Sequence, residues 1–257
     1  IATISGAGSR WTNDNFLVVG DNQGRGLLTV EYGAAMVNGN HLTVGDDGGD
    51  GRLVITNGAV FTNNNWTAVA PHPGAYGELT ITSDSAYRNK EFFAIGGFAG
   101  SRGIVTVADG SLLDVGMWLD VHPTGRLRGD GVIRADRFEN RGTLEPGAPR
   151  GVMTIETSVA QMSSATLEVE IGGRSRSADY DGLDVNGSFQ AAGALVIKFV
   201  SGFAPKAGDR FDLVRANQIE GAFDEIRLQG LASGFTFRVT NEDGVIALVA
   251  TSDGIAL

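Results

Sequence analysis

Residues 43–63 read TVGDDGGDGRLVITNGAVFTN, and the same pattern returns along the first half of the chain. The copies begin at residues 18, 43, 68 and 94, so they follow one another at intervals of 25, 25 and 26 residues. A partial copy lies in residues 2–13. Self-similarity at a fixed period of this length is typical of solenoids, in which each unit forms one coil and buries its apolar face against its neighbours.

Each copy predicts short strands separated by turns. Triplets such as Leu28–Thr29–Val30 alternate apolar and polar residues, which is the pattern of a half-buried strand. Each triplet is followed by a pair of residues typical of a turn, in which glycine, asparagine or aspartate can take positive φ at low cost. These pairs are Tyr32-Gly33, Asn57-Gly58, Ser83-Asp84 and Asp109-Gly110. No segment of this region has a helical period, so we predict an all-β protein, a parallel β-helix (β-solenoid) of about 25-residue coils.

Stacked coils place equivalent residues in columns about 4.8 Å apart. One predicted aromatic column is Phe16, His41, Trp66, Phe92 and Trp118, and a second is Trp11, Met36, Phe61, Tyr87 and Leu113. A third column is Asn13, Asn38, Asn63 and Asn89, which we interpret as a hydrogen-bonded asparagine ladder at a corner of the coil. Aromatic columns of a β-helix usually fill its core, so we expect both to be buried; a sugar-binding surface is the alternative.

The chain divides into three predicted parts. Residues 1–124 form five coils, residues 125–156 form irregular final coils, and residues 157–257 form a β-sandwich-like C-terminal cap with longer alternating strands. A cap is expected because the last coil of a solenoid otherwise exposes unpaired backbone groups.

Composition excludes several classes of function. The net charge of −10, with no basic patch, argues against nucleic acid as a partner. The absence of cysteine excludes disulfides and thiolate metal sites. No run of 18 apolar residues is present, so we expect no direct insertion of this chain into a membrane.

Acidic turns are the candidate metal ligands. Asp46, Asp47 and Asp50 lie in one glycine-rich turn, which predicts a solvated turn with a calcium ion as the alternative. A second acidic run, Asp179, Asp181 and Asp184, is interpreted as turn chemistry. We identify no catalytic and no cofactor-binding residue, and expect no cofactor other than that calcium ion. The carboxylates of Asp21 and Asp46, one rung apart, are the weak basis for an enzyme hypothesis.

The repeats resemble a known family. The G-x-LTV-x-x-G-A core of residues 26–34 is similar to repeats of autotransporter (type V secretion) passenger domains and of PEP-CTERM-associated extracellular proteins. Residues 140–147, NRGTLEPG, look like the N-x-G-x-L-x-PG pattern of passenger tails. The resemblance implies a location outside a bacterium or on its cell surface.

A structural or adhesive module is the function that this resemblance favours. Its expected partners are other surface proteins, polysaccharide or a second copy of the chain, bound through sheet faces or the open N-terminal coil. The alternative is a polysaccharide-degrading enzyme, a lyase or tailspike-like depolymerase, because β-helices also carry such enzymes.

Overall fold

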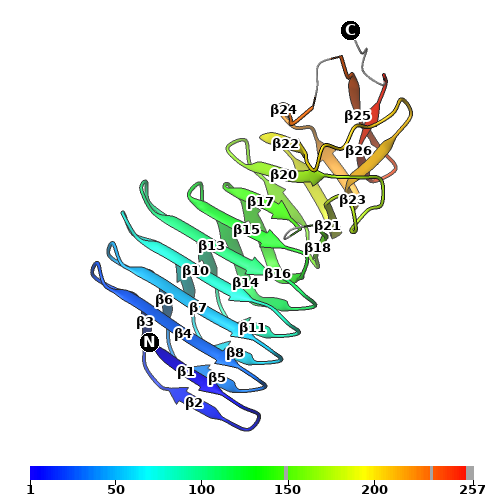
Figure 1. The fold of residues 1–257 in the computed structure, drawn as a ribbon. Helices are drawn as coiled ribbons and strands as arrows, with labels where there is room; N and C mark the ends of the chain where they lie inside the picture. Colours follow the sequence, from blue (N-terminus) through cyan, green and yellow to red (C-terminus); the bar gives the residue numbers. More distant parts are fainter. Residues whose placement is uncertain (148–149, 232–233, 253–257) are drawn as a thin grey trace.

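The predicted β-solenoid is confirmed. The structure, a computed structural model, describes residues 1–147, 150–231 and 234–252, and these residues form strands and turns without a helix. About 8 coils of about 26 residues stack along one axis, so the molecule is elongated (Figure 1). The described residues contain no helix long and apolar enough to cross a membrane.

One side of the stack is a ten-stranded sheet in which every neighbouring pair is parallel. Its strands are β1 (Ala2–Ser5), β4 (Arg25–Glu31), β7 (Asp50–Thr56), β10 (Tyr76–Ile81), β13 (Arg102–Val107), β15 (Gly125–Gly129), β17 (Thr143–Pro146), β20 (Thr166–Ile171), β22 (Ala194–Phe199) and β24 (Glu225–Gln229). The register follows the repeat, because Leu53 pairs with Leu28 below and with Leu79 above.

A sixteen-stranded sheet forms the rest of the coil wall, and each early coil adds two strands to it. The first set is β2 (Arg10–Asn13), β5 (Ala35–Asn38), β8 (Val60–Asn63) and β11 (Ala86–Asn89). The second set is β3 (Leu17–Val19), β6 (Leu42–Val44), β9 (Thr67–Val69) and β12 (Phe93–Ile95). Later strands are β14 (Leu112–Val121), β16 (Val132–Asn140), β18 (Val152–Ile155), β19 (Val159–Gln161), β21 (Gly182–Ala191), β23 (Arg210–Gly221), β25 (Phe237–Glu242) and β26 (Val245–Ala250).

The predicted turns connect the two sheets. All four predicted pairs have positive φ at both residues; for Asn57-Gly58 the angles are 54° and 73°. Asparagine and glycine tolerate this left-handed region at low cost, so the coil can reverse direction within two residues.

The core lies inside the coils, in continuous apolar columns. Leu53, Leu79 and Phe61 are fully buried, and so are most of their equivalents in other coils. The second aromatic column is therefore interior, as expected, except for Trp11, which is 37% exposed in the first coil. Each coil contributes too little apolar surface to fold alone, so this burial depends on the neighbouring coils.

Parallel pairing runs further along the chain than the predicted start of the cap at residue 157. β20 pairs in parallel with β17 and β22, and β22 with β24. Among the described residues, antiparallel ladders between strands are confined to β23 with β26 and β25 with β26. The end of the molecule is thus a continuation of the coils closed by a few antiparallel strands (Figure 1).

Candidate functional site

The asparagine column lies at the corner between the two sets of strands. Asn13 donates through Nδ2 to Oδ1 of Asn38 at 2.6 Å, Asn38 to Asn63 at 2.7 Å, and Asn63 to Asn89 at 3.0 Å. The column ends at Val115, which pairs with Asn89 in the next coil. Asn38, Asn63 and Asn89 are buried, so these amides find their partners within the protein.

The same amides hold the aromatic column in place. Nδ2 of Asn63 also donates to the backbone carbonyl of Trp66 at 2.8 Å. The equivalent bonds run from Asn13 to Phe16, from Asn38 to His41 and from Asn89 to Phe92, at 3.2, 3.0 and 3.0 Å. One amide per coil therefore fixes the backbone of one aromatic or imidazole residue.

The prediction that this aromatic column is buried was wrong. Phe16 is 53% exposed, Phe92 43% and Trp118 55%, while His41 and Trp66 are half-buried. The reason is strand alternation: Phe93 and Leu119 point into the core, so the residue before each of them points outward. The column is an outer feature of the sixteen-stranded sheet.

The rings of this column stack on one another. Ring centroids are 5.2 Å apart for Phe16 and His41, 4.5 Å for His41 and Trp66, and 5.8 Å for Trp66 and Phe92, with interplanar angles of 5°, 6° and 7°. Because the ring faces cover each other, the inner members offer only their edges to solvent. A ligand that packs on a ring face must therefore bind at an end of the stack.

The stack is interrupted between Phe92 and Trp118. Their strands remain in register, since Phe93 pairs with Leu119, yet within the described chain these two rings do not stack. The guanidinium of Arg137 lies 5.2 Å from the centre of the Trp118 ring instead. In this coil Val115 takes the place of the asparagine. The backbone of Trp118 therefore lacks the side-chain amide that binds the earlier residues of the column.

A hollow of about 270 Å³ occupies this interruption. It is lined by Phe92, Phe93, Ala94, Trp118, Asp120 and His122. Asp120 accepts hydrogen bonds from Arg141 at 2.6 and 2.7 Å, and its Oδ2 lies 3.7 Å from Nε2 of His122. Aromatic side chains at one end and polar groups at the other make the hollow amphipathic.

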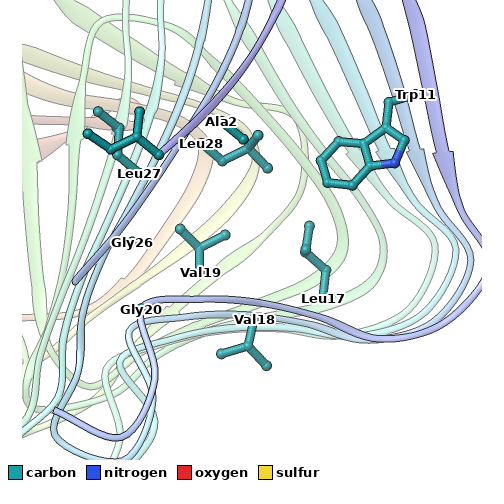
Figure 2. Close-up of a pocket in the computed structure, with 10 residues that line it drawn as sticks. Ala2, Trp11, Leu17, Val18, Val19, Gly20, Gly26, Leu27 and Leu28 are labelled. Carbon is teal, nitrogen blue, oxygen red and sulfur yellow. The ribbon is translucent and has the colours of Figure 1, made fainter. Parts of the chain in front are cut away.

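A second hollow, of about 210 Å³, lies at the first coil. Figure 2 shows Ala2, Trp11, Leu17, Val19 and Leu28 around it. These residues belong to the columns that form the core in later coils, and no charged side chain lines the space. The expectation that this first coil serves as an assembly surface stays a prediction.

The acidic turn does not bring together the three carboxylates that the alternative of a calcium site requires. Asp46 and Asp47 gather with His72 from the next coil, their ligand atoms all within 4.8 Å of one another, whereas Asp50 lies 3.7 Å from Arg25 and 3.4 Å from Arg52. Calcium takes oxygen ligands, while a set with one imidazole suits a transition metal such as zinc. The hydrogen bond with Asp46 raises the pKa of His72. Sequence reasoning missed His72 as a ligand, although the alignment of the copies places it at the position of Asp47 in the next coil.

The three carboxylates of the second acidic run have separate partners. Asp181 is buried and accepts backbone N–H bonds from Glu170 at 2.8 Å and Gly151 at 3.2 Å. Asp184 binds Arg176 at 2.7 and 3.2 Å, and Asp179 accepts from the backbone N–H of Ser175 at 3.0 Å. Burial raises the pKa of Asp181 to about 7. These carboxylates tie loops together and do not converge on a common point.

Asp21 and Asp46, the two carboxylates behind the enzyme hypothesis, lie in different surroundings. The carboxylate of Asp46 is engaged by the His72 ring, and Asp21 is exposed on the turn below.

The fold and its outer features define a β-solenoid with an aromatic column along one face. No family model matches the sequence, and no curated protein matches it.

Proposed function

We propose that this chain is an extracellular structural and adhesive module, similar to an autotransporter passenger, whose binding surface is the outer aromatic face. We define the aromatic face as Phe16, His41, Trp66, Phe92 and Trp118 with the surface between them. The observation that carries the proposal is the exposure of this column. Aromatic side chains that gather into one exposed patch mark interaction surfaces.

Rigidity supports an adhesive role. The asparagine column and the parallel sheets link each coil to the next, so the column residues keep a fixed spacing. A rigid array binds an extended partner without a large loss of conformational entropy on binding. A polysaccharide or an extended surface protein can contact several coils at once.

The charged side chains along the coils favour a partner that is not strongly charged. Charged side chains at the surface pair across coils, such as the half-buried Arg126 with Glu145 at 2.7 Å and the exposed Arg134 with Glu156 at 2.5 Å. The overall charge of −10 disfavours polyanions. Neutral polysaccharides of a bacterial envelope or biofilm are the partners that meet these conditions best.

Adhesion to polysaccharide-coated surfaces tests the proposal. We expect the purified chain to adhere to beads coated with bacterial envelope polysaccharide, and the variant Trp66→Ala/Phe92→Ala/Trp118→Ala to adhere at least about tenfold less. Tyr32→Ala is the matched control, since Tyr32 is 60% exposed but outside the column. Equal adhesion of the triple variant and the control would overturn the proposal.

A further inference from the structure

We infer that the hollow between Phe92 and Trp118 is a subsite for one ring of a neutral hexopyranose chain. The inference rests on the proposed function, because the hollow belongs to the aromatic face, and it names the ligand and its position.

Ring faces are available at this point of the column. Trp66 covers one face of Phe92, while the side of Phe92 toward the next coil opens into the hollow beside Trp118. A pyranose ring carries a face of C–H bonds that packs on an aromatic face, where the ring's negative potential meets the positive hydrogens. Between Phe16 and Phe92 each ring face is covered by the ring of the next coil, so a sugar cannot pack there.

The size of the hollow suits one sugar ring. Its volume of about 270 Å³ is just below the range of about 300–1,000 Å³ typical of drug-sized ligands. Ala94 lines it and pairs with Asp120 in the next coil. The small side chain of Ala94 fills little of the space beside the Phe92 ring. The hollow is open to the surface, so the sugar chain can continue along the sheet.

The polar end of the hollow favours a neutral sugar. Asp120 can accept hydrogen bonds from hydroxyls, and its charge is balanced by Arg141 at 2.6 Å. Arg141 also binds Glu139 at 2.6 Å, and Glu139 accepts a hydrogen bond from Arg137 at 3.2 Å, so the two guanidinium groups near the hollow are already paired with carboxylates. A uronate placed here adds a third carboxylate to those of Asp120 and Glu139, and the repulsion between like charges disfavours it.

Isothermal titration of the purified chain with soluble oligosaccharides tests the inference. The probes are cello-, manno- and galacto-oligosaccharides of six residues, with oligogalacturonate as the anionic comparison. We expect at least one neutral probe to bind. Two variants are expected to weaken binding at least about tenfold: Ala94→Leu, which fills the hollow, and Trp118→Ala, which removes one wall. Tyr32→Ala, at a residue that is 60% exposed and outside the aromatic face, is the control and is expected to bind as the parent does.

Three results would overturn the inference. These are equal binding by the parent and by both hollow variants, preference for oligogalacturonate, and absence of binding by all neutral probes. Thermal unfolding of each variant checks that it is folded. If the parent still adheres to coated beads and loses adhesion in the triple variant, only the sugar subsite is overturned and the adhesive face stands. If adhesion also fails, both are overturned.

Discussion

Nδ2 of Asn38 donates to Oδ1 of Asn63 at 2.7 Å and to the backbone carbonyl of His41 at 3.0 Å. One amide thus joins two coils and also fixes the position of an outer ring. Removing such an amide is expected to affect both the stability of the stack and the order of the aromatic face.

Replacing Asn63 by valine tests this coupling. Valine leaves the Asn38 amide without its acceptor and the carbonyl of Asn65 without this donor, while the carbonyl of Trp66 keeps only the N–H of Leu42, so we expect the free energy of unfolding to fall by about 3 kcal/mol. Chemical denaturation measures it. Asn64→Val, at a half-buried neighbour outside the column, is the control. A loss no larger than that of the control would contradict a structural role for the column.

The two aromatic columns are expected to respond differently to truncation. Phe61 is fully buried, so Phe61→Ala is expected to cost about 3–5 kcal/mol. Phe92 is 43% exposed, so Phe92→Ala is expected to cost about 1 kcal/mol or less. Denaturant melts of both variants give the comparison. Similar losses at the two positions would mean that the outer column is buried after all.

The pair of His72 and Asp46 predicts a pH dependence of stability. The hydrogen bond raises the pKa of His72 in the folded state, so the folded protein holds this proton more tightly than the unfolded chain. The stabilisation is fully present below the unfolded pKa of about 6.5, and it is lost as pH rises through the folded pKa. We expect His72→Ala to flatten this part of the stability profile. An unchanged profile in thermal melts between pH 5 and 9 would contradict the pairing.

Asp181 predicts a second pH effect, with the proton again favouring the fold. Burial raises its pKa to about 7, above the unfolded value of about 3.9, so stability is expected to fall as pH rises between these values. Asp181→Asn is expected to remove that dependence. It is also expected to cost about 1–3 kcal/mol, because an amide has one acceptor oxygen for the two N–H donors of Gly151 and Glu170. Melts that keep the parent's slope would oppose this assignment.

The fold could be predicted from the sequence because the columns repeat every 25 or 26 residues. Which column faces outward was harder to predict. Phe61 lies within strand β8, whereas Trp66 precedes strand β9. The corner at Asn63 separates the two strands, so the alternation of inward and outward side chains in β8 does not continue into β9. Both columns are aromatic, and composition does not distinguish them.

The structure differs from the sequence-based prediction at two other places, the acidic turn and the chain beyond residue 157. His72 joins Asp46 and Asp47 from the next coil, and a prediction made within one turn does not include it. Beyond residue 157, long strands such as β21 and β23 replace two short strands and a turn. The period therefore disappears from the sequence although parallel pairing between coils continues.

The measurement that tests the central claim most directly is sedimentation of the chain with insoluble neutral polysaccharides, followed by an assay of the supernatant for new reducing ends and unsaturated sugars. An adhesive module is expected to sediment with at least one polysaccharide through its aromatic face and to release no sugar. Measurable release of sugar by the parent chain, or sedimentation unchanged in Trp66→Ala/Phe92→Ala/Trp118→Ala, would contradict the account.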